Sequence, residues 1–527
     1  MIELLSADAM RRVEKERCES WGMETLLLME NAGAKIAQEI ERIIAHLKVH
    51  KVFVVCGVGN NGGDGLVVAR QLRSQFASLT IVVYLVGERK KMTKDTSFNW
   101  AVVRSLDIEL REVYREDDLY LDKDALVVDA LFGTGLKKPP EGIYAQVIER
   151  INQSGAFVVA IDVPSGVDAT CGQVLGRAVR ANLTVTLGKV KQGLVQFPAR
   201  EYVGCLKLVD IGIPLFGCFS SHLLEPEDVR KFLPRRTWDA HKISAGVVGI
   251  IAGSGAMLGA GILATWGSYA VGAGMVVWPL PEDLALLVKG AVPEMVNIVL
   301  PRRSVLDGWH YSFADFKSIQ EGIQARKCQS LVIGPGLGMH RGTGFFVERL
   351  LESVPQRGVL DADALNVVAT NRVYWKSKLS GWVCTPHAGE MARLLGTSLE
   401  EVNQDRVSAC QEGARYFGSI TVLKGAATVI ASPQGEVVIN PTGGPILATA
   451  GSGDVLSGII AGFMAQGLGG WESALCGVFL HGLAGDLWGR EGKKSIIARD
   501  IVEKLPEARR MVENGEYTIP FLVRDPC

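Results

Sequence analysis

Short apolar runs that end in a polar or glycine-rich loop recur along the whole chain. Residues 51–56 (KVFVVC) form one such run, which precedes the loop 57–65 (GVGNNGGDG) and then a helix-patterned segment. A continuous apolar run of this length is typical of a strand that is buried on both faces of a parallel sheet. Because parallel strands need crossover connections, the repeated pattern predicts a doubly wound α/β architecture with ligand loops at the carboxyl ends of the strands.

The alternation forms two separate series in a chain of 527 residues, which is longer than one compact domain usually is. The first series contains the predicted strands 51–56, 79–86, 125–130, 156–163, 183–187 and 205–210. The second contains 247–251, 331–333, 359–360, 382–384, 420–423, 429–430 and 436–439. The pattern lapses between residues 214 and 227. We therefore predict two doubly wound α/β domains, a Rossmann-like three-layer sandwich at 1–220 and a second domain at 221–510.

Three further segments carry specific structural expectations. Apolar spacing predicts a helix at 23–44 that is interrupted at 31–33 (NAG), and a helix at 66–73 that begins after the glycine-rich loop. Residues after Pro506 are charged and are expected to form a peripheral tail.

Composition and charge exclude several classes of protein. The net charge is −1 and charged residues make up 21% of the chain, which indicates neither a nucleic-acid partner nor a basic membrane-binding face. The ten cysteines are scattered without a C-x-x-C pair, which disfavours a zinc site or a disulfide framework and favours a reducing compartment. With no signal-peptide core and no membrane-spanning run, we expect a cytoplasmic protein. Its expected partners are small molecules and further copies of the same chain.

The segment 449–454 (TAGSGD) predicts an anion-binding helix start. Apolar residues follow it at helical spacing, so the glycine turn opens a helix and presents unpaired N–H groups. Such a start stabilises phosphate or developing negative charge. Asp454 lies in the first turn, where it could take a proton from a neighbouring hydroxyl. The alternative is that Ser452 and Asp454 only cap the helix.

The loop 57–65 satisfies the G-x-G-x-x-G pattern, so a plain dinucleotide-binding domain is one interpretation, with Glu88 as the ribose-binding acid. The loop is more polar than that task requires, however. It joins other side chains after neighbouring strands in an oxygen-rich set: Asn60, Asn61, Asp64, Asp129, Asp162 and Ser165. Such oxygens suit potassium as well as a divalent cation. The alternative is that the two strand-end aspartates only cap loops.

The motifs GVGNNGGDG, DALFGTGL and DVPSGVD, in this order, closely resemble the NAD(P)H-hydrate epimerase domain over residues 1–215. The resemblance implies a potassium ion held by Asn61, Asp129 and Ser165. It also implies contacts to the hydrated nicotinamide nucleotide from Asn60, Asn61, Gly62, Gly63, Asp64, Gly133, Thr134, Gly135, Leu136 and Asp162. Epimerisation needs a proton-transfer group, for which Asp162 is the candidate. A binding module without turnover is the alternative for this half.

Six motifs in the second half resemble the ADP/ATP-dependent NAD(P)H-hydrate dehydratases of the ribokinase-like superfamily. They are AGSGAMLGAG (252–261), GPGLG (334–338), DADAL (361–365), TPHAGE (385–390), KGAAT (424–428) and NPTGG (440–444). The resemblance implies nucleotide binding by Lys424, Gly425, Ala426, Ala427, Thr428 and Gly453. It implies substrate contacts from Ala260, Gly336, His387 and Asp454, with Mg²⁺ accompanying ADP. Asp361 and Asp363 are as consistent with loop capping as with ligand contact, and we do not assign them to the site.

Together the two resemblances imply a bifunctional repair enzyme, in which R and S hydrated NADH or NADPH interconvert and the S form is dehydrated. Asp454 would deprotonate the substrate hydroxyl, which attacks the terminal phosphoryl group of ADP; elimination of phosphate then restores the coenzyme and leaves AMP. The enzymatic alternative is a small-molecule kinase of the hydroxymethylpyrimidine type. The chain departs from the family pattern at 444–448 (GPILA), at Ala450 and at Ala388.

Overall fold

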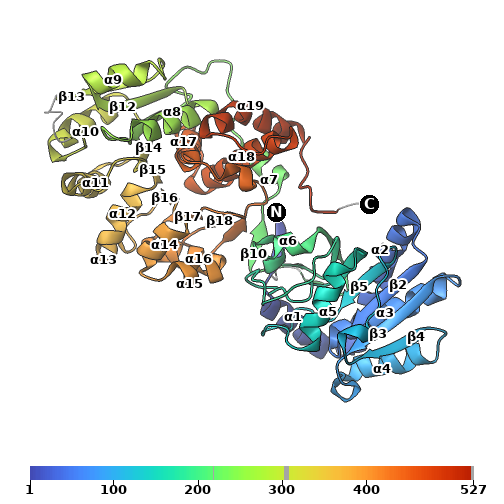
Figure 1. Ribbon diagram of the computed structural model, residues 1–527. Helices are drawn as coiled ribbons and strands as arrows, with labels where there is room; N and C mark the ends of the chain where they lie inside the picture. The colour runs from blue at the N-terminus through green and yellow to red at the C-terminus, as the bar shows by residue number, and fades with distance from the viewer. Residues whose placement is uncertain (216, 218, 302–307, 524–527) are drawn as a thin grey trace. The chain divides into compact units, whose positions relative to one another are not determined.

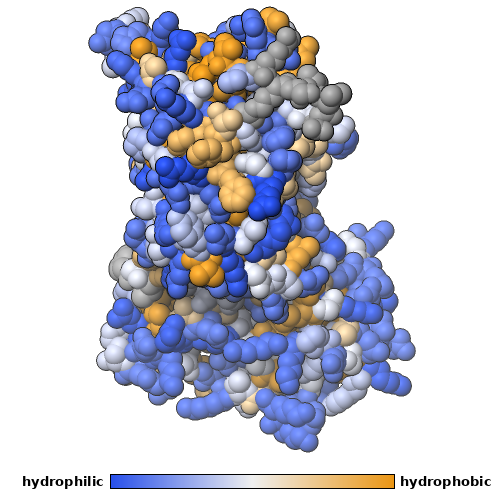
Figure 2. All heavy atoms as spheres, turned by 90° about the vertical axis from the view of Figure 1, so that its left-hand side faces the viewer, coloured by the Kyte–Doolittle hydropathy of each residue, from blue (hydrophilic) through white to orange (hydrophobic). Residues whose placement is uncertain are grey.

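The computed structural model describes residues 1–215, 217, 219–301 and 308–523 (Figure 1). The chain divides into two compact units. The N-terminal unit contains Ile2–His222 and the segment from Ile519 onward, and the C-terminal unit contains Met1 and Leu223–Thr518. None of the described helices is both long and apolar enough to cross a membrane. Hydrophilic side chains cover most of the face in Figure 2, with smaller apolar groups between them.

The N-terminal unit is built on an all-parallel sheet whose two faces are both buried. Val52 and Val54 pack into one apolar core, whereas Phe53 and Val55 pack into another, so alternate residues of one strand face opposite helical layers. The strands in spatial order are β4 (Glu109–Val113), β3 (Thr80–Val86), β2 (Lys51–Cys56), β5 (Leu126–Ala130), β6 (Phe157–Ile161), β7 (Leu183–Leu187) and β9 (Cys205–Val209). The predicted three-layer α/β architecture is confirmed.

Two helix predictions in this unit are wrong, and glycine packing explains both. Helix α2 (Thr25–Leu47) is continuous, because Gly33 allows a close contact with Val67. Helix α3 (Asn60–Gln75) begins inside the predicted loop. A Cβ on Gly62 would lie 1.9 Å from the carbonyl oxygen of Gly57, so this glycine serves a tight contact at the helix start instead of breaking the helix.

The chain returns to the N-terminal unit at its far end. Leu206 of β9 donates its N–H to the carbonyl oxygen of Phe521 (2.7 Å), and Val523 donates to that of Leu206 (3.0 Å). This short parallel bridge lies at an edge strand, whose unpaired groups would otherwise face solvent. The tail expected after Pro506 is also wrong in part, because helix α19 (Ala498–Asn514) continues through Pro506 and buries apolar side chains beyond it.

The C-terminal unit has a mixed sheet. Strands β11 to β17 pair in parallel, and two antiparallel strands extend the sheet beyond β17. In spatial order they are β13 (Val296–Leu300), β12 (Met275–Pro281), β11 (Val247–Ile251), β14 (Ser330–Ile333), β15 (Arg357–Leu360), β16 (Val383–Cys384), β17 (Ile420–Leu423), β18 (Val429–Ala431) and β19 (Val437–Ile439). Helices α10 (Phe316–Ala325), α11 (Arg341–Ser353) and α12 (Asp363–Thr370) share one apolar core with the parallel strands.

Two helices of this unit, α8 (Leu258–Ala270) and α17 (Ser452–Ala465), pack with their backbones in contact. A Cβ on Gly458 would lie 2.0 Å from the carbonyl oxygen of Ala264, and one on Gly267 would lie 2.3 Å from that of Val455. The hydroxyl of Ser268 donates to the carbonyl oxygen of Gly458 at 3.0 Å. This contact fixes the start of α17, where the Gly-Ser-Gly-Asp turn lies.

Candidate active sites

The glycine turn opens α17 as the sequence predicts. Gly451 is the N-cap residue with φ +86°, a conformation that favours glycine, and a Cβ there would lie 2.3 Å from the Leu263 side chain. Ser452, Gly453 and Asp454 form the first helical turn, so neither polar side chain occupies the N-cap position. The N–H groups of this turn have no partners within the helix and can stabilise an anion.

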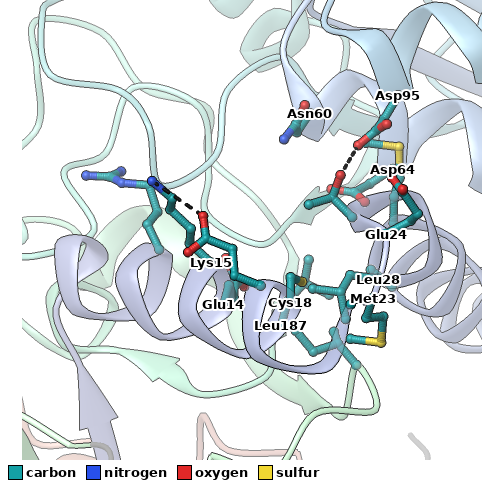
Figure 3. Close-up of a pocket in the computed structure, with 17 residues that line it drawn as sticks. Glu14, Lys15, Cys18, Met23, Glu24, Leu28, Asn60, Asp64, Asp95 and Leu187 are labelled. Atoms are coloured by element: carbon teal, nitrogen blue, oxygen red, sulfur yellow. Dashed lines mark hydrogen bonds and ion pairs between the residues drawn. The ribbon is translucent and has the colours of Figure 1, made fainter.

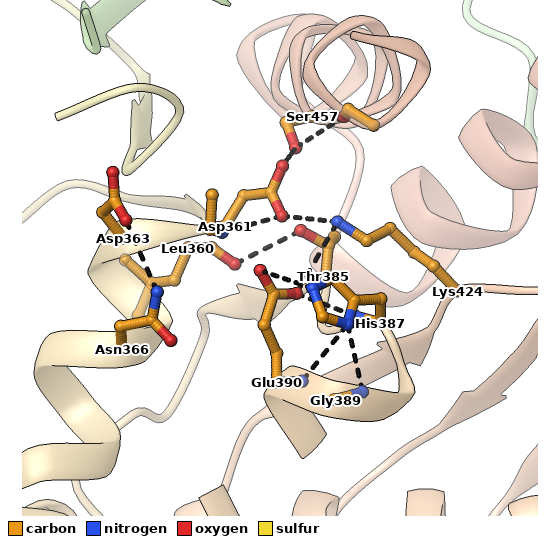
Figure 4. Close-up of polar contacts among 12 residues, drawn as sticks. Leu360, Asp361, Asp363, Asn366, Thr385, His387, Gly389, Glu390, Lys424 and Ser457 are labelled. Carbon is orange, nitrogen blue, oxygen red and sulfur yellow. Dashed lines mark hydrogen bonds and ion pairs between the residues drawn. The ribbon is translucent and has the colours of Figure 1, made fainter. Parts of the chain in front are cut away.

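A buried charge network lies behind the turn (Figure 4). Lys424 Nζ is 2.7 Å from Asp361 Oδ1 and 3.9 Å from Glu390 Oε2, and the Ser457 hydroxyl donates to Asp361 Oδ2 at 2.7 Å. Only 1% of Asp361 is exposed. A Cβ on Gly334 would lie 1.7 Å from the carbonyl oxygen of Asp361, so the loop after β14 lies directly against this residue. Asp361, left unassigned from sequence, is therefore a structural centre of the site.

Burial and the neighbouring charges shift the pKa values of the residues in and beside this network. Burial, reinforced by Asp361 and opposed by Lys424, raises the pKa of Asp454 to about 7. Burial, together with Asp361, also raises the pKa of Glu390. For Lys424, burial lowers the pKa, but Asp361 and Glu390 more than offset this, so its pKa is raised and the ammonium is retained. Asp454 can therefore exchange a proton close to neutral pH, which suits a general base.

The residues expected to contact substrate lie in two groups. Gly336 and Ala260 are neighbours, because a Cβ on Gly336 would lie 2.9 Å from Ala260 Cβ. His387 instead caps helix α14 (Ala388–Leu395): its Nδ1 accepts hydrogen bonds from the N–H groups of Gly389 (3.0 Å) and Glu390 (3.3 Å). Its side chain is 55% exposed. Contact between His387 and substrate remains a prediction.

The segment 424–428, expected to bind nucleotide, is a turn held by an arginine that sequence reasoning missed. Arg406, at the start of helix α16 (Arg406–Phe417), donates to the carbonyl oxygens of Leu423 (3.0 Å) and Lys424 (3.1 Å). Gly425 and Ala426 are exposed, whereas Ala427 is buried. Lys424 Nζ is 3.3 Å from the position of a Cβ on Gly453, so this segment and the glycine turn meet at one point.

The departures from the family pattern leave this geometry intact. Ala388 is the first residue of α14, a position where proline is favoured but any good helix former is accepted. Ile446 is half-buried in a short 3₁₀ turn (Pro445–Leu447), and Ala450 is exposed. The N–H of Gly443 in the preceding loop donates to Asp486 Oδ2 at 2.9 Å.

The buried His481 gives the C-terminal unit a pH-dependent stability. It lies on helix α18 (Gly470–Arg490) with Nε2 3.0 Å from the carbonyl oxygen of Ser452, and burial lowers its pKa to about 4.

In the unfolded chain the pKa of this histidine is about 6.5, so the stability that is present above that pH is lost as the pH falls toward 4. We expect a loss of about 3 kcal/mol over this range. Urea unfolding at about pH 7.5 and about pH 4.5 should show a larger loss for wild type than for His481→Gln. Equal losses in the two proteins would contradict this assignment.

The N-terminal unit holds a second polar cluster at the carboxyl ends of β5 and β6. Asp129 is fully buried and accepts hydrogen bonds from the Ser165 hydroxyl (2.6 Å) and the Ser165 N–H (2.8 Å). The Ser165 oxygen in turn accepts from the N–H of Phe132 at 2.9 Å. Burial raises the pKa of Asp129 to about 6, and these hydrogen bonds oppose that shift.

Asn61 completes this cluster and bears on the potassium expectation. Its Oδ1 lies 3.1 Å from the position of a Cβ on Gly133, next to Phe132, and the residue is 8% exposed. Its amide nitrogen has no hydrogen-bond partner among the described residues. That nitrogen cannot bind a cation, but the Asn61 amide oxygen, the Asp129 carboxylate and the Ser165 hydroxyl oxygen are the oxygen ligands that a potassium ion takes. The three residues named from sequence therefore fit such an ion.

Asp162 forms an ion pair that the sequence did not reveal. Lys191, the second residue of the short strand β8 (Val190–Lys191), places Nζ 2.5 Å from Asp162 Oδ1 and donates to the carbonyl oxygen of Leu187 at 2.6 Å. Lys191 is 1% exposed and Asp162 is 7% exposed. Asp162 also has φ +64°, which is uncommon outside glycine and typical of functional sites.

A cleft of about 640 Å³ opens beside this cluster, between α3 and the helices α1 (Ala7–Trp21) and α2 (Figure 3). Asn60 and Asp64, both expected to bind substrate, line it together with Glu14. Arg11 of α1 donates to the carbonyl oxygen of Thr134, in the loop 133–136 that is also expected to bind substrate. Of the residues predicted for this half, only Asn60 and Asp64 line the cleft, and the contacts of the others with substrate remain predictions.

Fold and sites together define the class: a two-domain α/β enzyme, with a Rossmann-like unit and a ribokinase-like unit that each carry a polar site. A family model described as NAD(P)H-hydrate dehydratase matches residues 248–507, and one described as YjeF-related protein N-terminus matches residues 25–193.

Full-length relatives make the assignment specific. The bifunctional NAD(P)H-hydrate repair enzyme Nnr of Moorella thermoacetica is 37% identical over 534 residues, covering 98% of each chain. That of Thermofilum pendens is 38% identical, covering 99% of this chain and 100% of the relative. A solved ADP/ATP-dependent NAD(P)H-hydrate dehydratase from Bacillus subtilis, co-crystallised with ATP and Mg²⁺, is 29% identical over 56% of this chain and 99% of its own, with a TM-score of 0.47. The chain belongs to the family of bifunctional NAD(P)H-hydrate repair enzymes, as its motifs predicted.

Proposed function

We propose that the N-terminal unit interconverts the R and S forms of hydrated NADH or NADPH, and that the C-terminal unit dehydrates the S form at the expense of ADP, giving AMP and phosphate. The observation that carries the proposal is the juxtaposition of Asp454, the anion-binding turn and Lys424 at one point of the ribokinase-like unit. The second site, around Asp162 and Asp129, supports a second activity in the same chain.

In the C-terminal site, Asp454 acts as the general base. It takes the proton of the substrate hydroxyl, and the oxygen attacks the terminal phosphoryl group of the nucleotide. The N–H groups of residues 452–454 stabilise the negative charge that develops there. Lys424, held by Asp361, offers positive charge to the phosphates. Phosphate then leaves more readily than hydroxide would. As the C–O bond breaks, the neighbouring ring carbon loses a proton and the C–H electron pair forms the ring double bond, which restores the coenzyme.

Mg²⁺ enters this site with the nucleotide in our proposal. Among the described residues, no three histidine, cysteine, aspartate or glutamate side chains form a cluster that could hold a metal ion. Mg²⁺ commonly binds phosphate oxygens and water with few protein ligands, and there it neutralises phosphoryl charge. Ala260, Gly336 and His387 are the proposed substrate contacts, and the segment 424–428 with Gly453 is the proposed nucleotide contact.

In the N-terminal site, Asp162 is the proposed proton-transfer group and Lys191 holds it in place. Asn61, Asp129 and Ser165 would hold potassium, which supplies a fixed positive charge close to the substrate loop 133–136. Asn60, Gly62, Gly63 and Asp64 form the first turns of α3 and are the proposed nucleotide contacts of that helix. The proposal further includes functional domains at 1–220 and 221–510, a homo-oligomeric state and a cytoplasmic location.

The first experiment follows absorbance at 340 nm while purified protein is incubated with mixed R and S hydrated NADH, K⁺, Mg²⁺ and ADP. Complete recovery of the reduced nicotinamide band, with phosphate release, is the expected result. If recovery stops once the S form is consumed, and continues only at the slow rate of spontaneous epimerisation, the protein has dehydratase activity but no epimerase activity. In the variant Asp162→Ala we expect this partial recovery, and full recovery there would refute the assignment of Asp162. A stable phosphorylated product would instead indicate a kinase.

A further inference from the structure

Helix α1 turns one face toward the segment that carries Lys191. Met10 packs on Gly188, since its Cε lies 2.5 Å from the position of a Cβ there. Glu14 follows Met10 by four residues and therefore projects from the same face of the helix. Arg11, on the adjacent part of the helix, reaches the substrate loop through Thr134. The helix thus spans the distance between the Lys191 segment and that loop, with Glu14 over the cleft.

Glu14 lines the cleft beside Asn60 and Asp64 (Figure 3). Burial raises its pKa to about 7; Lys191 and Arg11 oppose the shift and Asp162 adds to it. Asp64 lies in the first turns of α3, and its pKa is raised well above the ordinary value by burial, Asp162 and Glu14. These surroundings favour the neutral form of the Asp64 carboxyl, whereas Glu14 can exchange a proton near neutral pH. Cys18, one turn further along α1, also lies near Glu14, and Lys15 and Glu19 of the same helix line the cleft as well.

The chemistry of the proposed substrate requires two proton transfers. Hydration places the hydroxyl on a ring carbon bonded to the ring nitrogen, so inversion can proceed through an iminium ion. An acid protonates the hydroxyl, the C–O bond breaks and water leaves, while the nitrogen lone pair forms the C=N⁺ bond. Water then adds to the other face of that carbon: its oxygen lone pair forms the new C–O bond, the C=N⁺ π electrons return to nitrogen as its lone pair, and a base removes the surplus proton. One proton is consumed and one is released, and each face of the ring needs its own group.

We propose that Glu14 is the second proton-transfer group of the N-terminal site, acting from the α1 side of the cleft while the Asp162–Lys191 pair acts from the edge of the sheet. The inference rests on the proposed epimerase function and adds a residue to it. In one direction Glu14 protonates the leaving hydroxyl and Asp162 accepts the proton of the incoming water. In the reverse direction the two roles are exchanged.

The test compares Glu14→Gln with Glu16→Gln, an exposed neighbour on the same helix that does not line the cleft. Epimerisation of hydrated NADH should slow by about 100-fold or more in Glu14→Gln, the usual contribution of a general acid or base. Glu16→Gln should match wild type. Dehydration of the S form by the other unit should be unchanged in both variants, which shows that the C-terminal unit is folded and that the substrate is intact.

Two readouts separate proton transfer from a structural role. In wild type, kcat/KM for epimerisation should change with pH near 7, and this pH dependence should be absent from Glu14→Gln. Formate, which fits the cleft, should partly restore epimerisation in Glu14→Ala. A Glu14→Gln protein that epimerises at the wild-type rate would overturn the proposal. The proposal would also be overturned if Glu14→Gln were slow but kept the wild-type pH dependence, and formate did not restore Glu14→Ala. A wild-type chain that dehydrates the S form but never epimerises would overturn the proposed function itself, and the inference with it.

Discussion

Replacing Asp454 by asparagine should reduce nucleotide-dependent dehydration by about 10³-fold, within the range that general bases contribute. Asparagine has nearly the same shape but cannot take the proton of the substrate hydroxyl. The glycine turn that precedes it stays in place, because Gly451 and the contact between α8 and α17 set its position. Single-turnover recovery of absorbance at 340 nm, with saturating ADP and S-form substrate, measures the effect.

Two controls make this prediction specific. Epimerisation by the N-terminal unit should be unchanged in Asp454→Asn. In wild type, kcat/KM for dehydration should fall as the pH drops below about 7, because burial raises the pKa of Asp454 to about 7 and the base must be deprotonated. That limb should be absent from the variant. If Asp454→Asn keeps a large part of the wild-type rate, another group is the base.

Removing Asp361 should destabilise the C-terminal unit by about 3–5 kcal/mol, the usual cost of breaking a buried ion pair. Asp361→Ala leaves Lys424 Nζ, now 2.7 Å from a carboxylate oxygen, without its main counterion. It also removes one of the two acceptors of the Ser457 hydroxyl and leaves only the carbonyl oxygen of Gly453, at 3.1 Å. Glu390 still faces Lys424, but at 3.9 Å it makes no hydrogen bond with the ammonium and replaces Asp361 only in part. Hydrogen exchange of the β15 and β17 backbone amides reports the change in the unit concerned.

The matched control is the double variant Asp361→Leu/Lys424→Met. Because both charges are removed, we expect most of the lost stability to return, as apolar replacements of buried pairs often do. Dehydratase activity should not return, since Lys424 is proposed to contact the nucleotide. Equal destabilisation of the single and double variants would show that the pair contributes little and that packing around Asp361 is what matters.

The fold could be predicted largely because its strands are buried on both faces. The predicted strands 51–56, 183–187, 247–251 and 420–423 coincide with β2, β7, β11 and β17. Strand β12 was missed because it contains Pro279 and Pro281, which argue against a strand. Both prolines lie in the part of β12 that pairs only with β13, so one side needs no ladder hydrogen bonds.

The sites were predictable only where motif and chemistry coincide in one segment. Asp454 stands inside its glycine turn, so local sequence was sufficient. Asp361 and Lys191 act through partners that are 63 and 29 residues away along the chain, and no local pattern records such pairing. Glycine was misleading at the start of α3, because its low helix propensity carries no information about the close backbone contact that Gly62 makes.

The return of the chain to β9 has a consequence for synthesis. Leu206 leaves the ribosome long before its partners around Leu522, because the whole segment Leu223–Thr518 intervenes. At about 5–20 residues per second, translating that segment takes roughly 15–60 s. During this time the nascent N-terminal unit exposes an open sheet edge, and its last strand contact forms only when translation is nearly complete. Expressing residues 1–220 alone would make that transient exposure permanent, which favours edge-to-edge association.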